Sequence, residues 1–132
     1  MNRSYLGFII WLIVFLAVTF TLPFLPIESE SLLTRIMLNI TSLSILVLMV
    51  IIYFTEKIFW FNGVTYEEAI AAGSYRRKQY AKKMMIAFLI PFVIYLFASI
   101  ILQVLNVNIW IDIILFVVIT VVSALSTIKV KL

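Results

Sequence analysis

Residues 75–105 read YRRKQYAKKMMIAFLIPFVIYLFASIILQVL, a basic stretch followed at once by 22 residues that carry no charge. About 20 helical residues are needed to cross a hydrocarbon core of about 30 Å, and in lipid each backbone polar group needs a partner within its own segment. The uncharged part is therefore predicted to be a transmembrane helix, although its Ile, Val and Phe residues would favour strands in a soluble protein.

Three more stretches of similar length carry few charges or none. Of all residues in the chain, 65% are hydrophobic and 12% are charged, against about 45–50% and about 25% in soluble domains. We therefore predict an all-α, polytopic membrane protein in which residues 1–132 form one domain. Short loops predict that the spans pair as two antiparallel helical hairpins. The four predicted spans are residues 5–24, 32–54, 84–105 and 109–128.

The basic residues predict the orientation of these spans. Nine of the ten fall on one side of the membrane if the chain crosses four times: Arg3, Lys57, Arg76, Arg77, Lys78, Lys82, Lys83, Lys129 and Lys131. Basic residues concentrate in cytoplasmic loops. The sequence thus predicts a multi-pass protein of a cytoplasmic (inner) membrane, with both termini and residues 55–83 in the cytoplasm.

The segment between the second and third spans contains a helix start signal. Thr65 and Glu68 have the spacing of a capping box, in which each side chain bonds to the backbone N–H of the other residue. We expect a short cytoplasmic helix from Tyr66 to about Lys83 that leads toward the third span. Ahead of it, the aromatic residues of 58–61 are expected at the membrane interface.

The basic stretch before the third span is a candidate contact for anionic lipid headgroups. Juxtamembrane cations contribute about 1 kcal/mol each near an anionic leaflet. The plainer interpretation is that they only set the topology, and a nucleic-acid role is not expected because no recognition module accompanies them. The candidate residues are Arg76, Arg77, Lys78, Lys82 and Lys83.

A second candidate site is a group of polar residues in the outer half of the predicted bundle. Helical spacing places three on one face of the second span and three on one face of the third, while one opens the fourth. They are Arg35, Asn39, Ser42, Ser99, Gln103, Asn106 and Asp112. One interpretation is an outward-facing pocket with an Arg35–Asp112 ion pair. The other is ordinary hydrogen bonding between helices, with Arg35 extended to the headgroups near Glu28 and Glu30.

Catalysis is not expected. The chain has no cysteine and no histidine, which removes thiol chemistry and the usual metal ligands. Glu67-Glu68 invites comparison with the Glu-Glu-x-x-x-Arg motif of CAAX-type membrane proteases, but Ala72 occupies the arginine position. Neighbouring helix residues also point in different directions. We predict no enzymatic activity and no cofactor or metal.

These observations favour a non-enzymatic accessory, stabilising or immunity-type subunit that acts through a larger membrane partner. One alternative is a small oligomeric transporter or channel that uses the outer polar residues. The second alternative is an anionic-lipid-binding membrane protein. The expected partners are the lipid bilayer and either a membrane protein or further copies of this chain.

Overall fold

The computed structural model describes residues 3–61 and 63–132, and in these residues the chain is all-helical. Four α-helices are long and apolar enough to cross a membrane, with η1 extending the first of these stretches to Phe24, which confirms that part of the prediction. The α-helices are α1 (Leu6–Thr21), α2 (Glu30–Thr55), α3 (Tyr66–Val104) and α4 (Ile109–Thr127). Two short 3-10 helices accompany them, η1 (Leu22–Phe24) and η2 (Ile58–Trp60).

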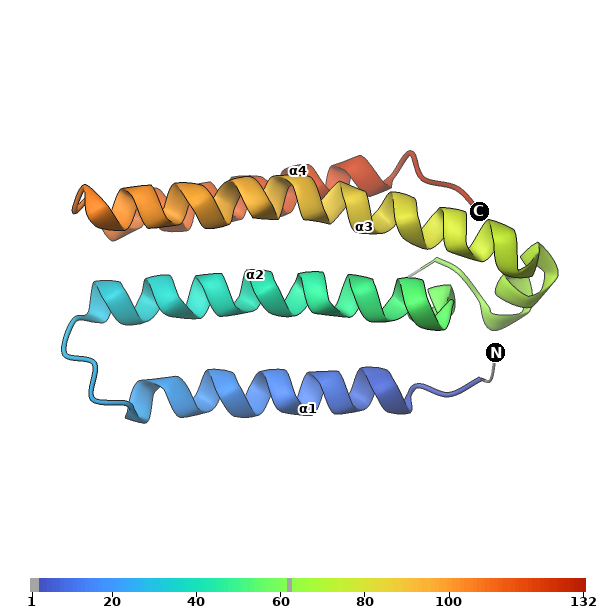
Figure 1. Ribbon diagram of the computed structural model, residues 1–132, viewed down its shortest axis with the longest axis horizontal. Helices are drawn as coiled ribbons and strands as arrows, with labels where there is room; N and C mark the ends of the chain where they lie inside the picture. The colour runs from blue at the N-terminus through green and yellow to red at the C-terminus, as the bar shows by residue number, and fades with distance from the viewer. Residues whose placement is uncertain (1–2, 62) are drawn as a thin grey trace.

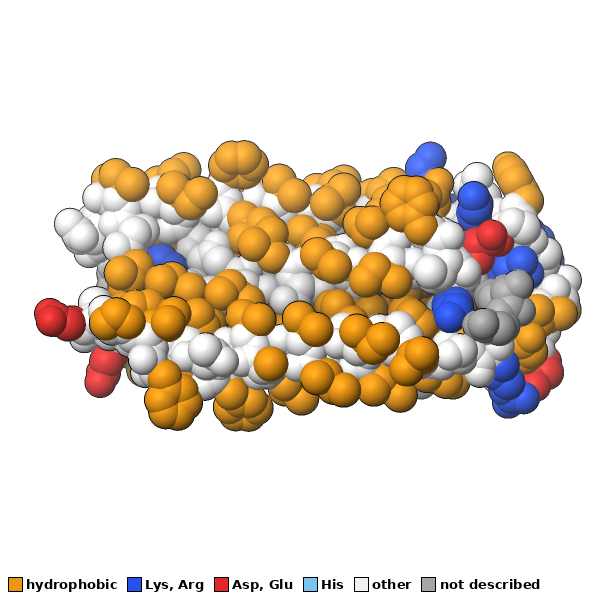
Figure 2. All heavy atoms as spheres, turned by 60° about the horizontal axis from the view of Figure 1, so that its bottom comes forward, with side chains coloured by type: hydrophobic (Ala, Val, Ile, Leu, Met, Phe, Trp, Pro, Cys, Tyr) orange, Lys and Arg blue, Asp and Glu red, His pale blue; other side chains and the backbone are white. Residues whose placement is uncertain are grey.

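The four α-helices lie along one long axis (Figure 1). The α1–α2 and α3–α4 connections lie at one end, which we call the loop end. The described parts of both termini and the segment around η2 lie at the other, which we call the terminal end. Helix α3 packs extensively against both α2 and α4, whereas α1 lies at the edge beside α2. The charged side chains gather mainly at the two ends (Figure 2).

The buried apolar side chains form two clusters. One, near the middle of the bundle, contains Phe92, Tyr95 and Ile119. The other, near the terminal end, is built around Ile52, Ile58, Phe59, Ala69, Tyr80, Ala81 and Met84. Of residues 58–61, which the sequence predicts at the membrane interface, Ile58 and Phe59 are buried within the protein and the other two are partly buried. After α2 the chain folds back as η2, and the Phe59 ring packs edge-on against the rings of Tyr5 and Tyr66.

Helix α1 is attached to the rest of the bundle through two tryptophans. The indole N–H of Trp11 donates to the Ser44 carbonyl at 2.9 Å, and that of Trp60 donates to the Ser4 carbonyl at 3.2 Å. Gly7 makes room for the second ring, because a Cβ there would lie 2.9 Å from Cη2 of Trp60. No residue of α1 is buried. Helix α1 therefore has few contacts with the rest of the bundle.

Helix α3 begins with both hydrogen bonds of the capping box. The Glu68 carboxylate accepts from the Thr65 N–H at 2.9 Å, and the Thr65 hydroxyl accepts from the Glu68 N–H at 3.1 Å. The helix then breaks at Gly73, where φ is 81° and ψ is 162°. The expected single helix from Tyr66 to about Lys83 was therefore wrong in its extent, because glycine adopts this backbone conformation at little cost. A short first part precedes the kink, and the helix after it continues to Val104.

The kink is held by contacts to the end of α2. Glu56, in the left-handed conformation that ends α2, accepts a hydrogen bond from the Ser74 hydroxyl at 2.5 Å. Its carboxylate also lies 3.4 Å from the Arg77 guanidinium. Arg77 reaches back across the kink and donates to the Ala69 carbonyl at 3.0 Å. These bonds fix the direction in which α3 leaves the terminal end.

Candidate functional site

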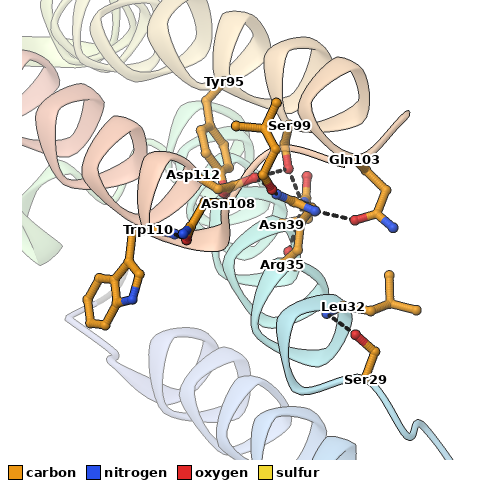
Figure 3. A network of polar contacts seen from close by, with 11 residues as sticks. Ser29, Leu32, Arg35, Asn39, Tyr95, Ser99, Gln103, Asn108, Trp110 and Asp112 are labelled. Carbon is orange, nitrogen blue, oxygen red and sulfur yellow. Dashed lines mark hydrogen bonds and ion pairs between the residues drawn. The ribbon is translucent and has the colours of Figure 1, made fainter. Parts of the chain in front are cut away.

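The outer polar residues meet at a buried ion pair between α2 and α4. Nε of Arg35 donates to Oδ2 of Asp112 at 2.8 Å. Arg35 is 6% exposed and Asp112 is fully buried. A charged pair this deep is stable only when further hydrogen bonds satisfy the remaining polar atoms. The neighbouring residues supply these bonds (Figure 3).

The Asp112 carboxylate is held from three sides. Oδ1 accepts from the Tyr95 hydroxyl at 2.5 Å, and Oδ2 accepts from the Ser99 hydroxyl at 2.8 Å as well as from Arg35. Asp112 also lies in the first turn of α4, where the helix dipole favours an anion. Asn108 caps this turn by accepting from the Trp110 N–H at 3.0 Å. The carboxylate therefore has good compensation for its burial.

The Arg35 guanidinium points into the bundle. Besides Asp112, it donates to the Gln103 side-chain oxygen and, at 3.4 Å, to the Val107 carbonyl. Arg35 thus bridges α2, α3 and α4 at the loop end, with its side chain turned toward the other helices. Asn39, one turn further along α2, donates to the Arg35 carbonyl at 2.7 Å and to the Ser99 hydroxyl at 3.0 Å.

The structure brings five of the seven expected outer polar residues into this network: Arg35, Asn39, Ser99, Gln103 and Asp112. Ser42 is buried but donates to the Leu38 carbonyl of its own helix. Asn106 lies in the α3–α4 loop with a φ of 52°. We refer to the five residues together with Tyr95 as the Arg35–Asp112 network.

Sequence reasoning missed Tyr95. It sits in an uncharged stretch, where a tyrosine is readily taken for an apolar packing residue. The signal was its spacing, because it precedes Ser99 by four residues and Gln103 by eight and so shares their helix face. A buried tyrosine hydroxyl usually has a hydrogen-bond partner, which here is the Asp112 carboxylate.

Two clefts meet at the Arg35 side chain. An apolar cleft of about 300 Å³ lies between α2 and α3, and a polar cleft of about 400 Å³ opens beside the two loops. Both are lined by Leu32, Arg35 and Gln103. Each volume falls at the lower end of the range of about 300–1,000 Å³ that is usual for small-molecule sites.

The basic stretch is only partly available to a ligand. Four of its five candidate residues are exposed: Arg76, Lys78, Lys82 and Lys83. The fifth, Arg77, is turned toward Glu56 and Ala69. The Ser74 hydroxyl, together with Arg77, holds the pKa of the Glu56 carboxyl below its usual value, against a smaller opposing effect of burial. Arg77 therefore has a structural role at the kink.

The chemistry that the described residues offer is binding by hydrogen bonds and by a compensated ion pair. Among residues 3–61 and 63–132, no three His, Cys, Asp or Glu side chains lie close enough together to hold a metal ion. No protein-family model matches the chain, and neither a curated protein nor a solved structure matches it. The functional argument therefore depends on the geometry of this chain alone.

Proposed function

We propose that this protein crosses a cytoplasmic membrane four times, with both termini and the segment around η2 in the cytoplasm. The length and hydropathy of the four helices support insertion. The excess of basic residues at the terminal end supports the orientation. The two short connections between helices are then the outer loops, and α1–α2 and α3–α4 are transmembrane hairpins.

Within that membrane we propose an accessory or stabilising role, exerted through contacts with a larger membrane protein. The observation that carries this proposal is the position of α1. It is apolar all round, has no buried residue and packs mainly against α2. A span that adds so little to its own bundle leaves most of its surface for other helices.

The groove between α1 and α2 is a suitable contact surface for one helix of such a partner. A cavity of about 260 Å³ lies there, lined by residues of both helices: Trp11, Val14, Phe15, Val18, Ile40, Leu43, Ser44 and Val47. A second, of about 340 Å³, follows near Ala17 and Thr21. Ser44, Ala17 and Thr21 are the small side chains in these two linings, and small side chains allow close approach of helices in lipid.

The middle of the bundle offers less support for the alternative of a solute pathway. The side chains of Phe92 and Tyr95 and the Asp112 carboxylate are fully buried between α2, α3 and α4. Transport would need either a large rearrangement of these groups or a pathway between several copies of the chain. Proteoliposome flux that is lost in Asn39→Leu or Gln103→Leu would favour that alternative.

The test of the accessory role is capture of the partner. A photo-crosslinking residue at Val14, in the α1–α2 groove, should join the tagged full-length chain to one stoichiometric membrane protein in native membranes. The same residue at Ile114, which is 60% exposed on α4, is the matched control and should crosslink mainly to lipid. Recovery of the lone chain from both variants, under several extraction conditions, would contradict the proposal.

A further inference from the structure

The two clefts at Arg35 share three lining residues, Leu32, Arg35 and Gln103, and we refer to the clefts as the polar and the apolar half of one candidate site. The polar half is lined by residues near the ends of helices and the α3–α4 loop, among them Ser29, Ser31, Asn106 and Asn108. The apolar half runs along α2 and α3, where Ile36, Ile40, Ile100 and Val104 supply most of the wall. Because Arg35 and Gln103 line both halves, one elongated molecule that extends past these two side chains would contact both halves. Such a site fits an amphiphile with a polar head and an apolar chain.

Arg35 has hydrogen-bond donors left for the head of such a molecule. A guanidinium carries five N–H groups. The described residues account for three of them, through contacts with Asp112, Gln103 and Val107. The remaining donors belong to the two terminal nitrogens, in a side chain that lines both clefts. A phosphate is the head that a fixed guanidinium fork binds best.

The charges of the loop end indicate which phosphate-bearing amphiphile fits. Asp112 already neutralises Arg35. Glu28 and Glu30 are exposed and flank Ser29, which lines the polar cleft. A headgroup with a net negative charge would be repelled by these two carboxylates. A zwitterionic headgroup offers them an ammonium group while its phosphate lies at Arg35.

We infer that the protein binds one zwitterionic phospholipid at the junction of the two clefts. The phosphate accepts hydrogen bonds from Arg35, the amine lies toward Glu28 and Glu30, and one acyl chain fills the apolar cleft between α2 and α3. The lipid comes from the leaflet at the loop end. The inference rests on the proposed insertion in a membrane, but not on the existence of a protein partner.

The test is native mass spectrometry of the full-length protein, released from a mild detergent that contains equal amounts of phosphatidylethanolamine and phosphatidylglycerol. One phosphatidylethanolamine should stay bound. Ile100→Trp fills the apolar cleft and should abolish retention. Ile101→Trp is the matched control, because Ile101 is the next residue of α3 and is similarly exposed, at 58% against 61%, but does not line the cleft.

A second variant tests the charge argument without touching the ion pair. Glu28→Gln with Glu30→Gln should reduce the preference for phosphatidylethanolamine, by up to about fivefold for each carboxylate. Three outcomes would overturn the inference. Both tryptophan variants could retain the lipid, both could lose it equally, or the unaltered protein could prefer phosphatidylglycerol. Failure to capture a protein partner would leave the lipid result unaffected, so the two proposals fail separately.

Discussion

Arg35 and Asp112 are separated by 77 positions in the sequence, yet their side chains form a 2.8 Å ion pair inside the bundle. The pair joins α2 to α4, and Tyr95, Ser99 and Gln103 join it to α3. Hydrogen bonds therefore join three helices to one another at the loop end. Arg35 and Gln103, two members of these contacts, also line both clefts.

Removing one member of the pair should destabilise the protein strongly. Asp112→Ala leaves Arg35 buried without its counter-charge, and loss of one partner of a buried pair typically costs about 3–5 kcal/mol. The free energy of unfolding in detergent micelles or bicelles measures this effect. Arg35→Met combined with Asp112→Leu should recover most of the loss, since no unpaired charge remains. Equal destabilisation by the single and double variants would contradict this account.

A side chain at Gly7 should loosen α1. The added Cβ of Gly7→Ala would lie 2.9 Å from the Trp60 ring, and overpacking of this kind typically costs about 1–3 kcal/mol. Faster hydrogen exchange over the first two turns of α1 is the expected readout. In a Trp60→Leu background the same substitution should have little effect, because the obstructing ring is gone. An undiminished effect in that background would show that Trp60 is not the cause.

Gly73→Ala should strain the kink of α3. The glycine has a φ of 81° and no atom within 4 Å of an added Cβ, so the expected cost of about 1–3 kcal/mol is purely conformational. Thermal unfolding measures it. Ala71→Ser, two residues earlier on the exposed surface, is the control and should change stability by less than about 0.5 kcal/mol. If the Gly73→Ala protein were as stable as the parent, residue 73 could leave the positive-φ conformation without a measurable cost in free energy.

The contacts of Glu56 predict a pH dependence of stability. Its folded pKa lies below the usual value of 4.5, so the ionised carboxylate stabilises the fold. That contribution is fully present above the unfolded pKa and is lost as the pH falls through the lower folded pKa. Unfolding measured as a function of pH should show the loss, and Glu56→Gln should remove this component. Glu28→Gln, at the opposite end of the bundle, should retain it.

Reporter fusions should locate the two ends of the bundle on opposite sides of the membrane. A reporter that is active only in the cytoplasm should be active when fused after Leu132. A reporter that is active only outside the cytoplasm should be active when inserted between Leu25 and Pro26. Neutralising Arg76, Lys78, Lys82 and Lys83 together should weaken this preference, because these exposed cations carry much of the charge bias. A cytoplasmic reading from the 25–26 insertion would refute the proposed topology.

The sequence was sufficient for the helical class and the number of apolar helices. Uncharged stretches such as residues 84–105 leave no alternative to internal backbone hydrogen bonding in lipid, and the structure confirms four helices of the required length and hydropathy. Local signals were also readable, because a capping box at Thr65 and Glu68 depends only on residues three positions apart. The face shared by Arg35 and Asn39 followed from helical spacing in the same way.

What needed the tertiary structure were the contacts between helices. Whether Arg35 extends to the headgroups or turns inward depends on the distance to Asp112, which spacing along the chain does not encode. The roles of Tyr95 and Arg77 were hidden for the same reason, because each takes its partner from another segment. In a chain this apolar, hydropathy determines which residues form helices. The buried polar groups add a constraint on how those helices rotate and pack, because a polar group away from water is costly without a hydrogen-bond partner.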